Sequence, residues 1–297
     1  MTLARFLLLC LLAAGLPPRA AAQQSADPGP IFDAYTREYY RLDPLSATAN
    51  GVQDYNDRMA IDISPAFDSA VRILTRRYLD TLATVNYAAL SESDRLSVDV
   101  FRYRLELLRE WVTPNYRAQR PVDQFVFSFP QRFALLGSGA GNIPFQTEKD
   151  YRNFMGRMKD FATWVDVAIA NMNEGLRTGN VNPKAAMEKV PAQLRPLFAD
   201  SSAAYLFYKP LQALPTGLDS AAAQRLRADY TATVDAFIRP AYRRLHDYLV
   251  ATYIPNARTT AGLSGNRNGA AEYAFALRFY TTTRITADEV FALGERE

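Results

Sequence analysis

The stretch that decides the fold runs from Thr147 to Gly179 and reads TEKDYRNFMGRMKDFATWVDVAIANMNEGLRTG. Its apolar residues recur at steps of three and four, the period of one helix face. They are Tyr151, Phe154, Met158, Phe161, Val165, Ile169, Met172 and Leu176. Thr147 is a suitable N-cap, and glycines at 175 and 179 suit a helix end. The stretch therefore predicts one long amphipathic helix.

Helical signals continue towards the N-terminus. Ser64-Pro65 predicts an N-cap followed by proline in the first turn, and Ser91 can cap the next helix. That next helix carries two apolar stripes, which predicts packing on two sides near the centre of a bundle. The first stripe is Leu96, Val100, Tyr103, Leu107 and Trp111, and the second is Phe101, Leu105, Leu108 and Val112.

Helical signals also continue towards the C-terminus. A long helix is expected to start at Asp219 and to kink at Pro240. Thr286 and Glu289 have capping-box spacing, but the helix that they begin has only about two turns to offset its nucleation. This pattern predicts a bundle truncated at its C-terminus. Its unpaired apolar side chains would be exposed and would favour self-association; they are Phe275, Phe279, Val290, Phe291 and Leu293.

Only residues 270–285 look strand-like, through Phe279, Tyr280, the threonines and Ile285. The expected fold class is therefore predominantly all-α: a multi-helix bundle with a short β hairpin or strand near residues 270–285.

The N-terminus has the pattern of a secretory signal peptide. Arg5 precedes an apolar run, Phe6–Leu16, and Ala20–Ala22 fits a cleavage site, so we expect residues 1–22 to be removed near Ala22. Cys10 follows leucine where a lipidation motif wants a small residue, so no stable membrane anchor is expected. Residues 23–297 would then form one helical domain without cysteine, periplasmic or secreted.

Composition excludes several kinds of chemistry. The formal net charge of +3 over 297 residues gives no electrostatic case for nucleic acid. His246 is the only histidine, so neither an HExxH helix nor a pair of imidazoles can hold zinc. No serine stands in a Gly-x-Ser-x-Gly context. The sequence therefore predicts no catalytic residue, metal ligand or cofactor in this chain, and a surface role for His246.

Several pieces of the chain, in their order, resemble a bacterial family catalogued as domain of unknown function 885 (DUF885). Leu42-Asp43-Pro44 with Ala47-Thr48 and Gly51 resembles its opening, and Tyr151 to Gly179 with Pro183 resembles its middle. The later pieces are similar to the family's approach to its active site; they are Tyr253 to Arg258, Gly269, Tyr273, Thr281 to Thr283, Thr286 and Leu293-Gly294.

That family resembles helical zinc metallopeptidases of the gluzincin type. Its members carry a His-Glu pair followed closely by Pro-Gly-His, downstream of the Thr-Thr segment. This chain has no such motif, and Tyr280 and Phe291 stand where many relatives have histidine. The resemblance implies that residues 23–297 are the N-terminal half of a zinc-dependent peptidase, inactive as given, with zinc expected only in a full-length relative.

By the same analogy, Tyr273, Thr281, Thr282 and Thr283 are the candidate substrate-binding residues, and an edge strand there could pair with an extended peptide. The plainer alternative is an ordinary hairpin that closes the bundle. The competing functional class is a non-catalytic periplasmic helical binding or scaffold protein.

Overall fold

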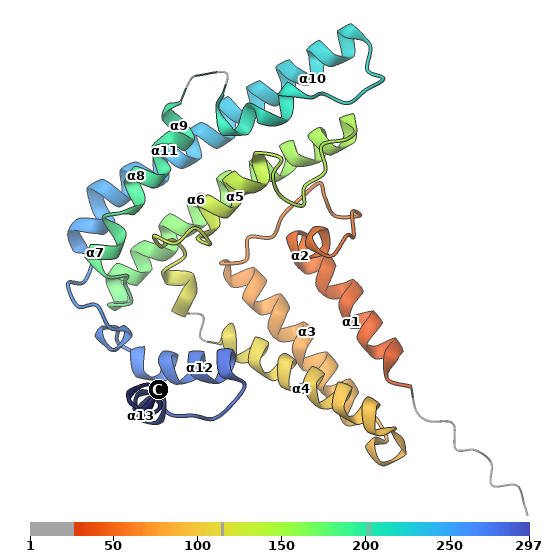
Figure 1. Cartoon of the computed structure of the whole chain (residues 1–297), viewed down its shortest axis with the longest axis vertical. Coiled ribbons are helices and arrows are strands. Elements are labelled where there is room, and N and C mark those ends of the chain that lie inside the picture. Colours follow the sequence, from red (N-terminus) through yellow and green to blue (C-terminus); the bar gives the residue numbers. More distant parts are fainter. Residues whose placement is uncertain (1–26, 114–115, 201, 203) are drawn as a thin grey trace, which may run out of the picture.

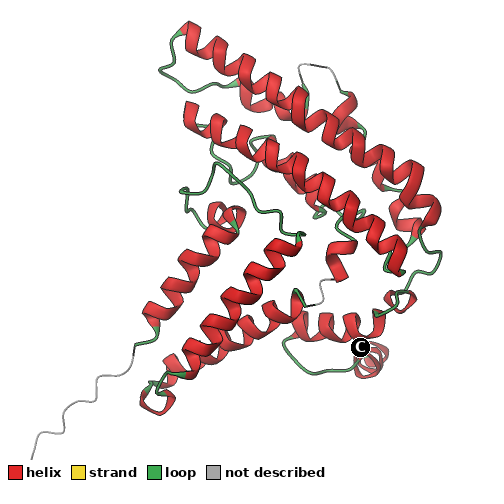
Figure 2. Cartoon of the chain, turned by 180° about the vertical axis from the view of Figure 1, so that it is seen from behind, coloured by secondary structure: helices red, strands yellow, loops and turns green. Residues whose placement is uncertain are grey.

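The computed structural model describes residues 27–113, 116–200, 202 and 204–297. Over this part of the chain the secondary structure is helical and no strand forms; one isolated bridge joins Pro183 and Arg258 (Figure 2). The predicted all-α fold class is confirmed. The predicted signal peptide, residues 1–22, lies outside the described residues.

The α-helices are α1 (Gly29–Leu42), α2 (Pro44–Ala49), α3 (Pro65–Ala83), α4 (Glu92–Trp111), α5 (Phe129–Gly137), α6 (Glu148–Thr178), α7 (Lys184–Met187), α8 (Val190–Leu194), α9 (Pro196–Ala199), α10 (Ser220–Thr233), α11 (Arg239–Tyr248), α12 (Gly269–Thr281) and α13 (Ala287–Arg296). Shorter helical turns join them: η1 (Tyr87–Ala89), η2 (Tyr116–Gln119), η3 (Leu206–Gln212), η4 (Val234–Ile238), η5 (Leu249–Tyr253), η6 (Ile254–Asn256) and η7 (Leu263–Gly265). Figure 1 shows α6 between the long α10–α11 run and the group formed by α1, α3 and α4. No helix in the described part of the chain is long and apolar enough to cross a membrane.

The long helix predicted from Thr147 forms as α6, with 31 residues. The Thr147 hydroxyl accepts the amide of Asp150 and the Asp150 carboxylate accepts the amide of Thr147, a capping box. Gly179 ends the helix at φ 76°, a left-handed conformation that suits glycine. The predicted stripe lies in the main core, although Ile169 and Leu176 are only partly buried.

The long helix predicted from Asp219 begins as α10, and the Asp219 carboxylate accepts the amide of Ala222. The sequence predicts a kink at Pro240; the structure has a π-helical turn, η4, directly before α11, which contains Pro240. Proline has no N–H and its ring crowds the preceding turn, so a widened turn relieves the conflict.

A buried arginine joins α6 to the N-terminal segment. Arg157 is fully buried; its Nη2 donates to the Thr48 hydroxyl at 2.6 Å and its Nε donates to the Arg58 carbonyl at 3.0 Å. The Thr48 hydroxyl in turn donates to Asn56 Oδ1 at 2.6 Å. Desolvation lowers the pKa of Arg157 to about 10, which leaves the guanidinium charged at neutral pH. Because the guanidinium is charged, its hydrogen bonds to these neutral acceptors are stronger than those of a neutral donor would be.

The same face of α6 makes further contacts with residues 57–63. A Cβ added at Gly156 would lie 2.2 Å from the Asp57 carbonyl oxygen, so only glycine allows this approach. Three more hydrogen bonds continue along the helix: Met59 N to Asp160 Oδ2 at 2.9 Å, Trp164 Nε1 to Asp62 Oδ1 at 2.8 Å, and Asn171 Nδ2 to the Ile63 carbonyl at 2.7 Å. We call this row, with Arg157, the α6 seam. It ends where Ser64 caps α3.

The two-sided packing predicted for α4 holds only in part. Phe101, Leu105, Leu108 and Val112 are buried or partly buried, as expected. In the other stripe, Leu96 is 66% exposed and Val100 is 55% exposed, because no described element covers the N-terminal turns of that face. α12 covers this face only towards the end of α4, at Tyr103 and Trp111.

The β hairpin or strand predicted near residues 270–285 is wrong, because residues 269–281 form helix α12. Four alanines lie at 270, 271, 274 and 276, and alanine has the highest helix propensity. Phe275 and Phe279, four residues apart, both contact Trp111. Without a strand, the predicted edge pairing with a peptide has no structural basis.

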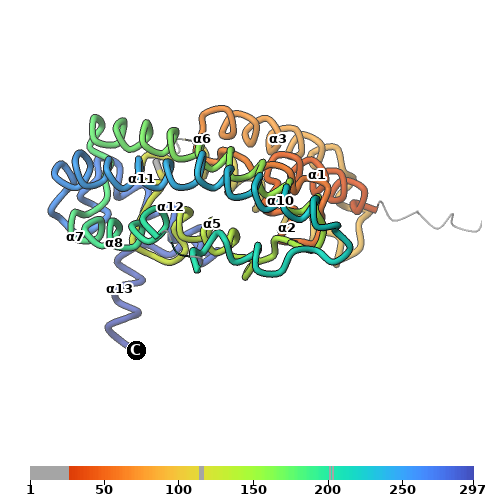
Figure 3. Tube along the Cα trace, turned by 90° about the horizontal axis from the view of Figure 1, so that it is seen from above, coloured from red at the N-terminus to blue at the C-terminus, as the bar shows by residue number. Residues whose placement is uncertain are grey.

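The capping box predicted at Thr286 is confirmed, and the helix that it begins, α13, projects from the rest of the molecule (Figure 3).

We expect Arg157→Met to lower the free energy of unfolding by about 3 kcal/mol, because buried acceptors lose a charged donor. Urea unfolding followed by circular dichroism measures it. The matched control is Arg152→Met on the same helix, where the arginine is 49% exposed and pairs with Glu148; its loss should be below about 1 kcal/mol. Equal losses in the two variants would contradict a special role for the α6 seam.

Candidate functional site: the groove between α4 and α12

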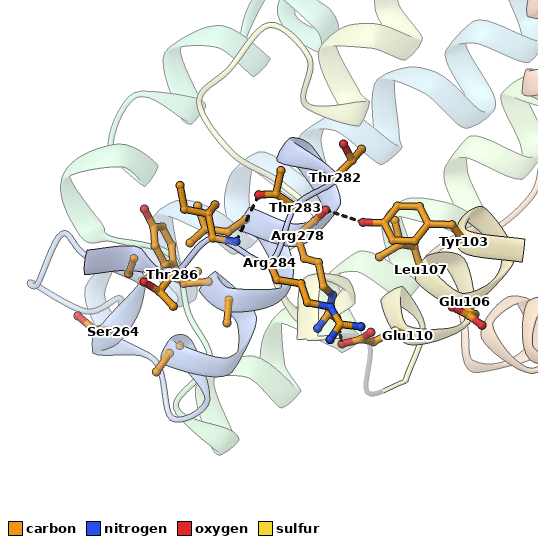
Figure 4. A pocket seen from close by; sticks show the side chains of 18 residues that line it. Tyr103, Glu106, Leu107, Glu110, Ser264, Arg278, Thr282, Thr283, Arg284 and Thr286 are labelled. Atoms are coloured by element: carbon orange, nitrogen blue, oxygen red, sulfur yellow. Dashed lines mark hydrogen bonds and ion pairs between the residues drawn. The ribbon is translucent and has the colours of Figure 1, made fainter. Parts of the chain in front are cut away.

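A groove of about 1090 Å³ lies between α4 and the segment from Leu263 to Ala287 (Figure 4). Four residues of α4 form one wall: Tyr103, Glu106, Leu107 and Glu110. The other wall consists of Leu263, Ser264, Gly269, Ala270, Tyr273, Ala274, Leu277, Arg278 and residues 282–287. Its volume is slightly above the usual range of ligand-binding clefts.

Aromatic packing holds α12 against α4. The Trp111 ring centroid lies 4.5 Å from that of Phe279 and 5.9 Å from that of Phe275. Two polar contacts cross the same interface: the Tyr103 hydroxyl donates to the Arg278 carbonyl at 3.1 Å, and the Arg278 guanidinium pairs with Glu110. The ion pair is partly exposed and contributes little, so the rings supply most of the attachment.

The start of α12 depends on a close backbone approach. A Cβ added at Gly269 would lie 1.8 Å from the Leu263 carbonyl oxygen. The loop before α12 can therefore pack against the start of this helix only because residue 269 has no side chain. Within this loop Asn266 is buried, and its Oδ1 accepts the amide of Val181 at 3.1 Å. This end of the groove is thereby tied to the residues that follow α6.

The sequence-predicted substrate residues lie at this groove, with one exception. Tyr273, which is 41% exposed, Thr282 and Thr283 line it. Thr281 does not: its hydroxyl donates to the Leu277 carbonyl at 2.7 Å and contacts the Thr283 hydroxyl at 2.9 Å. Thr282 ends α12 at φ 56°, where a β-branched residue is rare and strained. The threonines therefore build a tight turn, not a strand.

Sequence reasoning missed the charged residues of the groove. Glu106 and Glu110, four residues apart on α4, share one face and line the groove, opposite Arg278 and Arg284. Their spacing of four is visible in the sequence, but an exposed acidic pair on a helix does not by itself indicate a site. With the hydroxyls of Tyr273, Thr282 and Thr283, they give the groove hydrogen-bond donors and acceptors on both walls.

Neither a histidine nor a metal site belongs to the groove. His246 Nδ1 lies 2.8 Å from Asp247 Oδ1, and its ring packs near Phe198. Among residues 27–113, 116–200, 202 and 204–297 no group of three or more His, Cys, Asp and Glu side chains could hold a metal ion. The described residues thus do not fit a zinc site.

Comparison with known proteins supplies the family context. The model of a family described as "Bacterial protein of unknown function (DUF885)" matches residues 44–297. A solved structure described as "The crystal structure of the putative lipoprotein from Colwellia psychrerythraea" is similar, with a TM-score of 0.71 and 16% sequence identity. The match covers 93% of this chain and 48% of that one, so the chain spans about half the length of this relative. At this identity the likeness shows the fold alone. No curated protein matches the chain.

We expect Trp111→Ala to loosen α12, because it removes the ring that holds Phe275 and Phe279. Amide hydrogen exchange followed by mass spectrometry should show protection of residues 269–281 falling by about tenfold or more. The exchange of α6 should not change. Val100→Ala on the same helix, where the side chain is 55% exposed, is the control. Unchanged exchange in α12 would show that the polar contacts alone hold this helix against α4.

Proposed function

We propose that this chain, which belongs to the DUF885 family of bacterial proteins, binds an extended peptide in the groove between α4 and α12. The main evidence for this proposal is the groove itself. Its two walls offer carboxylates, guanidinium groups and hydroxyls, which are the partners that a peptide's backbone and charged side chains need. Its volume, about 1090 Å³, exceeds what a single amino acid would fill.

We further propose that this chain corresponds to the substrate-binding half of a peptidase-like protein. The zinc ligands and the catalytic glutamate would come from polypeptide outside residues 1–297, and the bound zinc would activate the attacking water. Two findings support this division: the solved relative is about twice as long, and the described residues offer no metal site. Tyr273, Thr282 and Thr283 then have a binding role, with Thr281 supporting their turn.

Export is part of the proposal. It rests on Arg5, the apolar run Phe6–Leu16 and Ala20–Ala22, which together suit cleavage near Ala22. The solved relative also carries the word lipoprotein in its name, and bacteria export their lipoproteins. N-terminal sequencing of protein recovered from a periplasm tests the cleavage position.

Peptide binding is tested by fluorescence anisotropy with labelled, unstructured ten-residue peptides of differing charge. We expect at least one to bind, and Tyr273→Ala to weaken its binding by about tenfold. Tyr87→Ala is the matched control, because Tyr87 is 39% exposed and lies outside the groove. Absence of binding by every peptide, or equal affinities of the two variants, would refute the groove as a peptide site.

The second candidate, a non-catalytic scaffold protein, has one observation in its favour. Phe291 is 70% exposed and Leu293 is 42% exposed, and Val290 is the one residue of α13 that is partly buried. Such a helix can pack against another protein surface or a second copy. Phe275 and Phe279, also expected to be exposed, instead pack on Trp111.

If α13 drives self-association, sedimentation velocity should show oligomers of the unmodified chain at micromolar concentration. Replacing Phe291 and Leu293 together by aspartate should restore a monomer, because charge on both residues disfavours burial. Replacing Asp288 and Glu295, exposed residues of the same helix, by asparagine and glutamine is the control. A monomeric unmodified chain would exclude this role for α13.

A further inference from the structure

The apolar wall of the groove continues along α4 beyond the part that α12 covers. Tyr103 and Leu107 line the groove, and Val100 and Leu96 precede them on the same helix face at steps of three and four residues. Val100 is 55% exposed and Leu96 is 66% exposed. We call these four side chains the α4 strip. A ligand that leaves the groove towards the start of α4 therefore meets further apolar surface.

An acidic edge borders this strip on one side. Asp99, Glu106 and Glu110 follow one another at steps of seven and four residues, so they share one side of α4. Glu106 and Glu110 line the groove, and Figure 4 shows both on the helix that carries Tyr103 and Leu107. Apolar surface beside carboxylates is complementary to a ligand that carries apolar and basic groups together.

Glu106 is the member of this acidic edge that no described cation neutralises. Glu110 pairs with Arg278. Asp99 Oδ1 lies 3.6 Å from Arg102 Nη1. Glu106 has no ion-pair partner within 4.0 Å in the described part of the chain, and Figure 4 shows it apart from Arg278. Its side chain is exposed, so water surrounds this carboxylate in the free protein.

A peptide bound in the groove would cover the Glu106 carboxylate. Covering a charge removes water from it, which is unfavourable unless the ligand supplies an opposite charge. Lysine or arginine supplies that charge in a charge-assisted hydrogen bond, whereas glutamate or aspartate would add repulsion. Arg284, in the opposite wall, also has no ion pair with a described residue. The net charge of a peptide therefore matters less than which of its residues lies over Glu106.

We propose that the groove selects peptides in which a lysine or arginine stands among apolar residues, and that Glu106 binds the basic side chain. This inference rests on the proposed peptide binding and specifies the class of peptide. Alternate residues of an extended peptide are about 6.6 Å apart. Positions four residues apart on α4 are about 6 Å apart. A peptide that runs along α4 therefore places one side chain per helical turn, the basic one at Glu106 and apolar ones at Val100 and Leu96.

Fluorescence anisotropy with three labelled ten-residue peptides tests the charge requirement. The peptides share a background of alternating leucine and serine and differ at one central residue, which is lysine, Nε-acetyllysine or glutamate. We expect the lysine peptide to bind at least about tenfold more tightly than the acetyllysine peptide, and the glutamate peptide to bind most weakly. Equal affinities would contradict the role of Glu106 and leave peptide binding intact. If these three fail while other peptides bind, this inference is wrong; if no peptide binds, the proposed function fails with it.

Variants of Glu106 separate recognition of the ligand from a structural role. Glu106→Gln should make the lysine and acetyllysine peptides bind alike, because it removes the charge and keeps the shape. Glu106→Arg should reverse the preference, so that the glutamate peptide binds about tenfold more tightly than the lysine peptide. Glu188→Gln is the control and should keep the preference, because Glu188 is exposed and lies outside the groove. A preference for lysine that survives Glu106→Arg would overturn the proposal.

Peptide length tests the contact with the α4 strip. Residues 96–110 span about 21 Å of helix, and residues 103–110 at the groove span about 10 Å. An extended ten-residue peptide reaches about 33 Å and a five-residue peptide about 16 Å. Replacing Leu96 and Val100 together by serine should weaken the ten-residue lysine peptide by about fivefold or more and its central five-residue piece by less than about twofold. Val126→Ser is the control, because Val126 is 72% exposed and outside the groove. No loss, or equal losses at both lengths, would show that the peptide does not run along the strip.

Discussion

The arrangement of this molecule depends on the buried guanidinium of Arg157 and the α6 seam that continues from it. Helix α6 faces the main core on one side, where apolar burial fixes it. Residues 44–63 add Met59 to this core, with Leu45, Ile61 and Ile63 partly buried against it. Directional hydrogen bonds with Arg157, Asp160, Trp164 and Asn171 hold that segment as well. Such bonds set position more sharply than apolar contact, which is non-directional.

The consequences of the seam reach the groove between α4 and α12. It ends at Ile63, and α3 starts two residues later, so the seam determines where α3 begins. α4 packs antiparallel to α3 and presents Trp111 at its end. That side chain contacts Phe275 and Phe279 in α12, the helix that forms much of the other wall of the groove, and it stacks on Arg117.

Local sequence patterns predicted the helices but not the long-range contacts that hold them together. The α6 stripe and the caps at Ser64, Thr147 and Thr286 were readable because each depends on residues within one or two turns. Arg157 could not be recognised, because it stands among polar residues as a surface arginine would, and its acceptors are about 100 residues away. The strand prediction for residues 270–285 was wrong for another reason. Aromatic residues and threonines have high strand propensity, but here the alanines favoured helix and the threonines formed its terminal turn.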